Sequence, residues 1–599
     1  MSEVALLEVE NLGVAYDGRA AVAGVSFSLG RGRCLGVIGE SGAGKSQSFL
    51  ALMGLLPRAA RVSGEARLGG VPLLSAAGAA LRGREVAMIF QDPMTSLTPH
   101  LTIGDQVAEP LVHHRGMSWD EARARAARLL DEVRMTDAPR RLNQYPHELS
   151  GGMRQRATIA MALACDPAFL IADEPTTALD VSVQAQILAL LRSIVDERGT
   201  ALAVITHDMG VIAALADDVV VMRDGSIVER GSVARVLQDP EHEYTRALLA
   251  ATPRIDEPGA SVSTQQPASA SPLFVRDVHV HHNVRAGGWF RKRGTLAAVD
   301  GVGFEVAAGE ALGIVGESGS GKSTLTRALL RLMPLARGEI VWLGRPIQDL
   351  AGEELRQVRA GLQIVFQDPF ASLDPRMSVT DIVAEPLAAL RPEMSAAERA
   401  DRVAAMLARV GLDAEYSARR SRELSGGQCQ RVAIARAMVL EPKLLVCDEA
   451  VSALDVSVQA QILELLETIK REQGTSIVFV SHNLAVVRRL CERILVMYLG
   501  REVESGPTDA VFRSPLHPYT RLLLDSVPSI DPAVGRARLA AIDSRDEMPS
   551  AFQRPGGCSF RTRCPAALPT CAARSPGPED AGDTRRVACL RWRELVNQP

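Results

Sequence analysis

The chain of 599 residues contains the same ordered set of motifs twice, and this duplication constrains its fold more than any other feature. The segment GESGAGKS at residues 39–46 recurs as GESGSGKS at residues 316–323. Three further landmarks recur 275 or 276 residues apart: FQDP from Phe90 and Phe366, LSGG from Leu149 and Leu424, and Asp-Glu from Asp173 and Asp448. Because the register changes by so few residues, we expect two copies of one domain.

The composition between the two copies predicts a linker. Residues 257–272 read EPGASVSTQQPASASP, which is rich in Ser, Ala, Pro and Gln and has no apolar periodicity. We therefore expect a first domain at residues 1–255, a flexible linker at 256–272, a second domain at 273–528 and an extension rich in cysteine at 529–599.

The overall composition excludes several classes of protein. Hydrophobic residues make up 47% and charged residues 23%, which is typical of globular chains rather than of fibres or disordered tails. The formal charge of -4 lacks the basic bias of proteins that wrap phosphate backbones, so we expect no nucleic-acid partner. We see neither an uninterrupted apolar run long enough for a membrane span nor a secretory signal, and we expect a cytoplasmic protein.

Short apolar runs that end at a glycine or a polar residue predict buried parallel strands. They lie at Cys34–Ile38, Ala168–Ala172 and Ala201–Ile205, and in the second copy at Leu312–Val315, Lys443–Cys447 and Ser476–Val480. Helical periodicity from Val183 to Leu191 stops before Gly199, and capping boxes begin at Ser118 and Ser395 at the same place in each copy. The expected fold class is α/β with a helical insertion in each copy.

Each G-x-x-x-x-G-K-S segment follows a predicted strand and precedes a predicted helix, which is the context of a phosphate-binding loop. Its backbone N–H groups converge on phosphate oxygens, and its lysine, Lys45 or Lys322, neutralises their charge. The hydroxyls of Ser46 and Ser323 suit Mg²⁺.

The Asp-Glu pairs favour hydrolysis over simple binding. Asp173 and Asp448 end apolar strands, where an open α/β sheet presents its ligand site, and their carboxylates can hold Mg²⁺. The adjacent Glu174 and Glu449 can orient or deprotonate the water that attacks a γ-phosphate. The alternative is an acidic pair that only caps the following turn.

Each copy combines the phosphate loop with a glutamine, an LSGG segment, an Asp-Glu pair, an Ala-Leu-Asp segment and a histidine after a later strand. The glutamines are Gln91 and Gln367, and the Ala-Leu-Asp segments end at Asp180 and Asp455. In this set of motifs the chain resembles two ATPase domains of ABC transporters. The resemblance implies tandem P-loop domains, each with a RecA-like parallel-sheet core, an antiparallel β subdomain and a helical subdomain. It also implies that the two halves of one chain form the ATPase pseudo-dimer. Each ATP then lies between the phosphate loop of one half and the Ser-Gly-Gly segment of the other.

Carried onto this sequence, the resemblance implies the following site residues. ATP contacts fall on Tyr16, Gly39, Ser41, Gly42, Gly44, Lys45, Ser46, Gln47, Ser150, Gly151 and Gly152, and in the second copy on Gly316, Ser318, Gly319, Gly321, Lys322, Ser323, Thr324, Ser425, Gly426, Gly427 and Gln428. Catalytic roles fall on Gln91, Glu174, His207, Gln367, Glu449 and His482. Contacts to Mg²⁺ fall on Ser46, Gln91, Asp173, Ser323, Gln367 and Asp448.

The two copies differ at two of these positions. Tyr16 lies where the family stacks an aromatic ring on adenine, although a tyrosine that only packs at a strand end is the alternative. Aligning residues 7–16 with 273–282 puts His282 at that place in the second copy. Met153 replaces the usual glutamine after Ser-Gly-Gly, whereas Gln428 keeps it. Because every catalytic carboxylate and histidine is present twice, we expect two competent sites whose rates can differ.

Longer motifs resemble the ATPases of bacterial oligopeptide/dipeptide importers. They are the segments at 91–99, 173–186 and 367–375, and the HEYT and HPYT segments from His242 and His517. The resemblance implies two transmembrane permease subunits contacted near Gln91 and Gln367, an extracytoplasmic substrate-binding protein, and a peripheral position on the cytoplasmic side of the bacterial cell membrane. The solute would be a peptide or a peptide-like molecule, and its identity stays open between nickel chelates, glutathione and opines.

Four cysteines gather in the last 42 residues: Cys558, Cys564, Cys571 and Cys589. Four thiolates can complete a tetrahedral zinc site or hold an iron–sulfur cluster, and free thiols are the third alternative. Because the surrounding residues resemble the C-terminal extension of peptide-importer ATPases, where such a cluster can occur, we expect a [4Fe-4S] cluster first and Zn²⁺ second.

Two other functions stay open. A soluble tandem ABC ATPase that acts on ribosomes or DNA would carry a long charged linker, a zinc insertion or a coiled coil within the repeat, none of which we find. A regulator that only binds ATP is disfavoured by Glu174 and Glu449.

Overall fold

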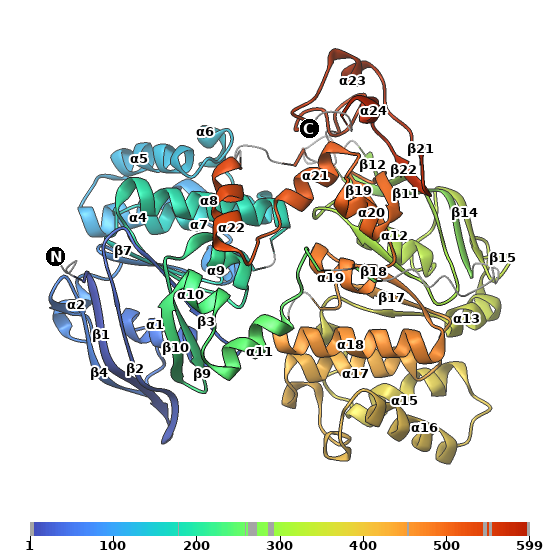
Figure 1. The fold of residues 1–599 in the computed structure, drawn as a ribbon, viewed down its shortest axis with the longest axis horizontal. Coiled ribbons are helices and arrows are strands. Elements are labelled where there is room, and N and C mark those ends of the chain that lie inside the picture. The colour runs from blue at the N-terminus through green and yellow to red at the C-terminus, as the bar shows by residue number, and fades with distance from the viewer. Residues whose placement is uncertain are drawn as a thin grey trace. The chain divides into compact units, whose positions relative to one another are not determined.

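A computed structural model describes residues 5–177, 179–257, 259–260, 272–285, 293–451, 454–542, 548–549 and 554–595. The chain forms two compact units (Figure 1). One contains Met1–Thr252 with Asp455–Ser457 and Asp525–Glu547, and the other contains Pro253–Leu454, Val458–Leu524 and Met548–Pro599. Most of the predicted linker, residues 258 and 261–271, lies outside the described residues.

The first unit is built on a six-stranded sheet in the order β10-β9-β3-β8-β7-β6. Its strands are β3 (Cys34–Ile38), β6 (Val86–Ile89), β7 (Phe169–Asp173), β8 (Ala201–Ile205), β9 (Asp218–Arg223) and β10 (Ser226–Ser232). The neighbouring pairs β6–β7, β7–β8, β8–β3 and β3–β9 are parallel, and β10 is antiparallel to β9. Because β3, β7 and β8 are buried along their whole length, they read in the sequence as unbroken apolar runs, and these predicted strands are confirmed.

A second, antiparallel sheet has the order β2-β1-β4-β5. Its strands are β1 (Leu7–Tyr16), β2 (Arg19–Leu29), β4 (Ala60–Leu68) and β5 (Val71–Pro72). Its apolar side chains share one core cluster with Phe49 of α1 and with Val37 of β3. The antiparallel sheet therefore packs against one face of the parallel sheet. The phosphate loop begins at the end of β3, a strand of this parallel sheet.

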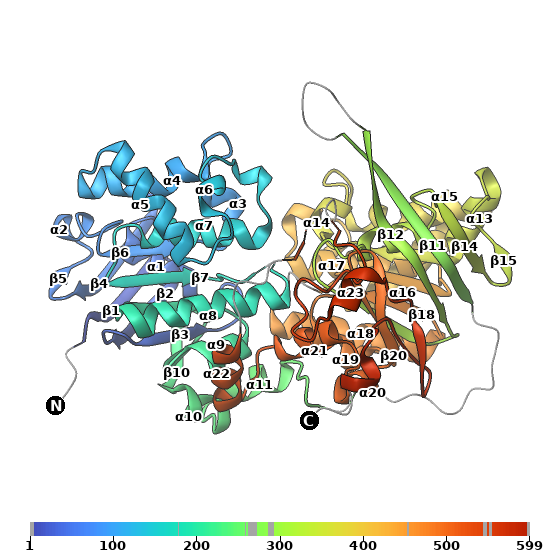
Figure 2. The same cartoon turned by 90° about the horizontal axis from the view of Figure 1, so that it is seen from above.

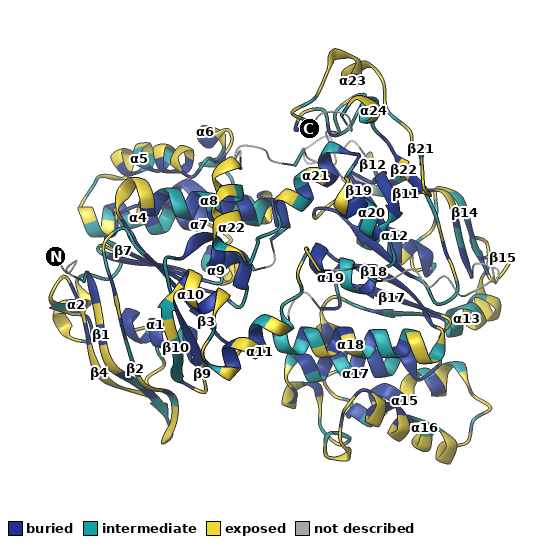
Figure 3. Ribbon diagram, viewed as in Figure 1, coloured by how far each residue is buried: buried dark blue, intermediate teal, exposed yellow. Residues whose placement is uncertain are grey.

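Helices cover the rest of the first unit. They are α1 (Lys45–Met53), α2 (Ala76–Ala79), α3 (Pro93–Ser96), α4 (Ile103–Arg115), α5 (Trp119–Glu132), α6 (Ala138–Arg141), a 3-10 turn (Pro146–Glu148), α7 (Gly151–Leu163), α8 (Val181–Arg198), α9 (Met209–Leu215), α10 (Val233–Gln238) and α11 (Glu243–Ala251). The run from α3 to α7 lies between β6 and β7 and is the predicted helical insertion. Figure 3 shows that α5 exposes one face, while its other face buries Ala122, Ala126, Leu129 and Leu130. The capping box at Ser118 and the stop at Gly199 are confirmed.

The second unit repeats this order. Its strands are β11 (Leu273–Arg285), β12 (Arg293–Val306), β13 (Ala311–Val315), β14 (Arg337–Trp342), β15 (Arg345–Pro346), β16 (Leu362–Val365), β17 (Leu444–Asp448), β18 (Ser476–Val480), β19 (Arg493–Tyr498) and β20 (Arg501–Pro507). Its helices are α12 (Lys322–Leu329), α13 (Gly352–Gly361), α14 (Pro369–Ser372), α15 (Val379–Leu390), α16 (Ala396–Arg409), 3-10 turns at Ala414–Tyr416 and Ser421–Glu423, α17 (Gly426–Met438), α18 (Val456–Gln473), α19 (Leu484–Leu490), α20 (Thr508–Arg513) and α21 (Pro518–Asp525).

The part of the cysteine-rich extension from Met548 onward belongs to the second unit. It contains α23 (Pro569–Ala573), β21 (Glu579–Gly582), β22 (Arg585–Val587) and α24 (Trp592–Leu595). Strand β22 pairs with β20, so the sheet of the second copy extends to eight strands in the order β16-β17-β18-β13-β19-β20-β22-β21. Arg585 donates to the fully buried carboxylate of Glu504, 2.7 Å away, which fixes the added hairpin on the sheet.

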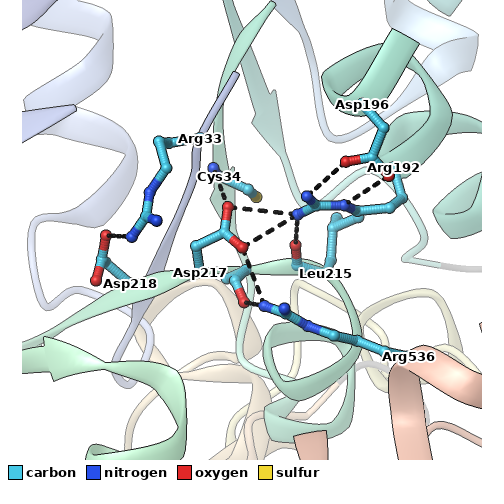
Figure 4. Close-up of polar contacts among 9 residues, drawn as sticks. Arg33, Cys34, Arg192, Asp196, Leu215, Asp217, Asp218 and Arg536 are labelled. Atoms are coloured by element: carbon cyan, nitrogen blue, oxygen red, sulfur yellow. Dashed lines mark hydrogen bonds and ion pairs between the residues drawn. The ribbon is translucent and has the colours of Figure 1, made fainter. Parts of the chain in front are cut away.

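The helix α22 (Pro532–Ala541) belongs to the first unit although it follows the second copy in the sequence. It packs against α9 and α8, beside them in Figure 2 as in Figure 1. Arg536 donates to the carbonyl of Ala216 at 2.7 Å and to Asp217 at 3.0 Å. Figure 4 shows that Asp217 also accepts from Arg192 and from the backbone of Cys34. No sequence motif predicts this return, because the segment has no counterpart among the repeated motifs.

Candidate active sites

The phosphate loop of each copy has a backbone that requires glycine. Gly39 has φ 152, and a Cβ atom there would lie 2.2 Å from the carbonyl oxygen of Met222. Gly316 has φ 150, and its Cβ would lie equally close to the carbonyl oxygen of Met497. A side chain at either place would push the loop away from the neighbouring strand that carries this carbonyl, β9 or β19. The local fold therefore depends on these glycines.

The lysine of each loop points back at the loop itself. The ammonium of Lys45 donates to the carbonyls of Gly39 and Glu40 at 2.6 and 2.9 Å, and Lys322 makes the same contacts to Gly316 and Glu317 at 2.7 and 3.1 Å. Burial lowers the pKa of Lys45, and nearby carboxylates, chiefly Glu174, partly oppose this shift. Each ammonium thus lies inside the loop where phosphate oxygens would enter.

A hydroxyl and a carboxylate meet at the carboxyl end of β7 and again at the end of β17. The hydroxyl of Ser46 donates to Asp173 at 3.0 Å, and that of Ser323 donates to Asp448 at 3.1 Å. Burial raises the pKa of both aspartates despite the serine hydrogen bonds. Oxygen donors of these two kinds are the ligands that Mg²⁺ prefers, and a cation would favour the charged form of each carboxylate. These residues therefore fit the predicted Mg²⁺.

Glu174 accepts hydrogen bonds from three side chains, two of which lie far from it in the sequence. The amide of Gln91 lies 2.7 Å from its carboxylate, the hydroxyl of Thr177 2.9 Å, and Nδ1 of His207 3.3 Å. Burial would raise the pKa of Glu174, but the hydrogen bond and charge of His207 outweigh it and lower that pKa. Burial would lower the pKa of His207, and Glu174 outweighs it and raises that pKa. The glutamate is therefore held ionised, as a general base must be.

The second copy repeats the arrangement. The amide of Gln367 donates to Glu449 at 2.7 Å, and Nδ1 of His482 lies 3.5 Å from the same carboxylate. The pKa of Glu449 is lowered because His482 and Lys322 outweigh its burial. Sequence reasoning placed these residues in one site but missed two features, the contact of Thr177 and the left-handed backbone of both glutamates.

That backbone distinguishes the glutamates from the preceding aspartates. Glu174 has φ 46 and Glu449 has φ 52, in the left-handed region that such residues rarely adopt. Each N–H donates to the end of the neighbouring strand, to the carbonyl of Ile205 at 2.8 Å and of Val480 at 3.0 Å. The turn away from the strand directs these carboxylates toward the glutamine and histidine rather than along the sheet.

The adenine position shows the expected difference between the copies. Tyr16 ends β1, and its hydroxyl donates to the side chain of Gln47 in α1 at 2.6 Å. His282 occupies the equivalent place on β11, with Nε2 3.5 Å from the hydroxyl of Thr324. The alignment of the two strands thus places both residues beside the start of the phosphate-loop helix. Stacking on adenine stays a prediction.

The Ser-Gly-Gly segments begin the helices α7 and α17. Ser150 caps α7 by accepting from the N–H of Met153 at 3.3 Å, and Ser425 caps α17 by accepting from the N–H of Gln428 at 3.3 Å. The side-chain oxygen of Gln428 in turn accepts from the N–H of Ser425 at 2.9 Å, which completes a capping box. Met153 has no oxygen with which to do so. Both helix starts present N–H groups suited to an anion.

The four cysteines of the extension line one small cavity. Cys558, Cys564, Cys571 and Cys589 surround a volume of about 20 Å³ together with His517 and Phe560. Burial raises the pKa of Cys558 and Cys564, and that of Cys589 to about 11. Across the described residues, however, no three His, Cys, Asp or Glu side chains are placed closely enough to hold a metal ion. A volume of about 20 Å³ admits one water-sized group, so a four-iron cluster would require the cysteine loops to open.

Comparison with known families matches both copies. Residues 22–177 and 299–452 match the ABC transporter family, and residues 228–275 and 503–571 match the C-terminal region of oligopeptide/dipeptide transporters. The chain therefore belongs to the ABC transporter ATPases, in the oligopeptide/dipeptide group, with two ATPase domains in one chain. It is an ABC-type ATPase coupled to import. The predicted family, fold class and enzyme activity are confirmed.

Curated relatives resemble the chain over nearly its whole length. The glutathione import ATP-binding proteins GsiA of Escherichia coli strain K12 and of Shigella boydii are each 47% identical over 582 residues, covering 91% of this chain and 93% of theirs. Among solved structures, a dimeric post-hydrolysis state of the ATP-binding cassette MJ0796, bound to ADP and Pi, is 30% identical, with a TM-score of 0.36, and covers 39% of this chain and 98% of that one. None of these matches supports the expected iron–sulfur cluster. No described helix has the length and apolar character that a membrane crossing needs.

Proposed function

We propose that this chain powers uptake of a small peptide or peptide-like solute through two separate transmembrane permease subunits, which receive the solute from an extracytoplasmic binding protein. The observation that carries this proposal is that both copies hold a complete glutamine–glutamate–histidine group beside a phosphate loop. A chain built only to bind ATP would not need two such groups. The proposal places the protein on the cytoplasmic face of the membrane, with the regions of Gln91 and Gln367 toward the permeases.

In the proposed reaction, Lys45 and the loop N–H groups bind the β- and γ-phosphates of ATP. Glu174 orients a water and takes its proton as the water oxygen bonds to the γ-phosphorus and the bond to the β–γ bridging oxygen breaks, which releases ADP and phosphate. His207 holds the glutamate and contacts the γ-phosphate. Mg²⁺, held by Ser46 and Asp173, supplies charge neutralisation on the phosphate oxygens.

We further propose that each site is composite. Lys45 and Glu174 act with the segment Ser425–Gly427, and Lys322 and Glu449 act with Ser150–Gly152. ATP then favours closure of the two halves and hydrolysis allows them to reopen, which moves the permeases.

Glutathione is the first solute to test, because the curated relatives are named for its import. The chain is reconstituted in proteoliposomes with the permeases that copurify with it and a matching binding protein. We expect ATP-dependent uptake of labelled glutathione or of a short peptide, and no uptake with Glu174→Gln and Glu449→Gln together. Absence of uptake for every peptide, combined with ATPase activity stimulated by ribosomes or DNA, would instead establish the soluble tandem ATPase as the function.

We also propose that the four cysteines of the extension bind a metal centre, because all four line one cavity. Since no three described ligand side chains are placed to hold a metal ion in this structure, binding would have to draw the cysteine loops around the metal. Protein prepared without oxygen is analysed for iron, acid-labile sulfide and zinc. Iron with sulfide and visible absorbance identifies a cluster, and one zinc per chain without absorbance identifies a zinc site. The variant Cys571→Ser should lose the metal and the control Cys165→Ser, a buried cysteine of the first unit, should keep it. Protein free of all three would overturn the proposal.

A further inference from the structure

The phosphate loop of the second copy is joined to the cysteine-rich extension by a buried ion pair. Both terminal nitrogens of Arg563 donate to the carboxylate of Glu317, at 2.6 and 2.9 Å. The two side chains are only 3% and 2% exposed. Glu317 is the second residue of the phosphate loop, and Arg563 directly precedes Cys564, which lines the cysteine cavity.

Glu317 is held at three points. Its N–H donates to the hydroxyl of Tyr519 at 2.9 Å, its carbonyl accepts from the ammonium of Lys322 at 3.1 Å, and its carboxylate accepts from Arg563. A shift of the arginine would therefore move the carbonyl that helps to place Lys322. The ion pair thus connects the extension to the lysine expected to bind phosphate.

Arg563 is itself held in place by aromatic rings. Its guanidinium lies 5.9 Å from the ring centre of Tyr498 and 5.8 Å from that of Phe560. Phe560 belongs to the extension and its ring also lies 5.4 Å from that of Tyr519. Burial opposes the charge of Arg563, but Glu317 outweighs it and raises the arginine pKa further. Loss of either charge would leave the other buried without its ionic partner, which is strongly unfavourable.

The first copy lacks this connection. The N–H of Glu40 donates to the hydroxyl of Tyr244 at 3.1 Å, and its carbonyl accepts from Lys45 at 2.9 Å, as in the second copy. Its carboxylate, however, forms no ion pair with any residue that the structure describes. Arg223 takes the place of Tyr498 and lies over the ring of Tyr244. The two loops share their backbone contacts and differ in what holds the glutamate side chain.

We propose that Arg563 is a positioning residue of the second ATP site, which fixes Glu317 and through it Lys322. ATP affinity at the second loop then depends on the cysteine-rich extension, whereas affinity at the first loop does not. This inference rests on the assignment of both loops as ATP sites.

The test measures the two sites separately in the full chain. A chain carrying Glu174→Gln, Glu449→Gln and an engineered protease site in the linker is photolabelled with increasing azido-ATP and then cut into its two halves. With Arg563→Gln we expect half-maximal labelling of the second half to need about 10-fold more nucleotide, while the first half changes less than about 2-fold. The control Arg574→Gln removes an exposed arginine of the same extension and should change neither half.

Two further variants keep the test decisive. Arg563→Lys keeps the charge but loses the paired hydrogen bonds, so it should give a smaller shift in the same half. Arg563→Gln with Glu317→Gln replaces the ion pair by two amides that can bond to each other, and should restore most of the affinity. Equal weakening of both halves, or no change in either among variants that remain folded by thermal unfolding, would overturn the proposal. Absence of labelling in the test chain that keeps Arg563 would contradict the assignment of both loops as ATP sites.

Discussion

At the scale of single residues, the proposed chemistry depends on Glu174 and Glu449. Each is half-buried, and its pKa is lowered chiefly because the neighbouring histidine outweighs burial. Each also leaves its strand through a left-handed backbone. The neighbouring aspartates have the opposite electrostatic shift, with burial raising their pKa. One carboxylate of each pair is thus prepared to accept a proton and the other to accept a cation.

We predict that Glu174→Gln together with Glu449→Gln lowers the rate of phosphate release at least about 100-fold, because an amide cannot accept the proton of the attacking water. ATP affinity should stay within a few-fold, since glutamine keeps the size of the side chain. Phosphate release and equilibrium ATP binding measure the two effects. Near-normal turnover in the double variant would remove both glutamates from the role of general base.

A second prediction concerns the proton of His207, whose pKa is raised because Glu174 outweighs burial. The pair contributes stability between the lowered pKa of Glu174 and the raised pKa of His207. That contribution is lost as pH falls through the former or rises through the latter. Titration of His207 by NMR should give a pKa above that of a free imidazole, and Glu174→Gln should bring it down, because burial then acts without the carboxylate. An unchanged titration in the variant would contradict the assigned cause.

At the scale of elements, α22 joins a late segment of the chain to the first unit. Its apolar contacts include Leu539, and Gly535 lies close against Ala214 of α9. Arg536 adds charge-assisted bonds to the end of α9 and to Asp217, where Arg192 also donates (Figure 4). These bonds fix the register of α22 on the helices beneath it.

We expect Arg536→Ala to weaken the docking of α22 by about 1–2 kcal/mol. The charged arginine then no longer donates to the carbonyl of Ala216 or to Asp217, while the apolar contacts remain. Hydrogen exchange of residues 532–541 should become faster, without a matching change in α5. The control Val534→Ala alters a side chain on the same helix that is 39% exposed and should have little effect. Unchanged exchange with Arg536→Ala would show that apolar packing alone holds the helix.

At the scale of the whole molecule, the duplication matters because we propose that each site takes residues from both copies. Fusion of the copies supplies each with its partner at high effective concentration. It also allows the copies to diverge, as Tyr16 and His282, Met153 and Gln428 illustrate.

Composite sites predict which double variants share a defect. In the background Glu174→Gln with Glu449→Gln, Lys45→Ala combined with Ser425→Arg should damage one site and leave about one occluded nucleotide per chain. Lys45→Ala combined with Ser150→Arg should damage both sites and leave none. Retained nucleotide is counted after rapid gel filtration. The reverse result would mean that each copy binds ATP with its own Ser-Gly-Gly segment.

The sequence by itself determined the family, the two copies and the buried strands, and it supplied the residues that we propose as catalytic groups. These follow from short motifs, because phosphate binding needs particular residues at fixed spacing and buried strands need unbroken apolar runs. It also aligned His282 with Tyr16, and each of these residues contacts the side chain that follows the serine of its own phosphate loop, Thr324 or Gln47.

Only the tertiary structure decided which late segments return to early ones. Arg563 reaches Glu317 across 246 residues, and Arg536 reaches Asp217 across 319. Neither arginine differs in sequence from the many that lie on the surface. Folding brings one carboxylate within reach of each arginine. At Arg563, which is 3% exposed, it also removes the competing water, whereas Arg536 stays 47% exposed.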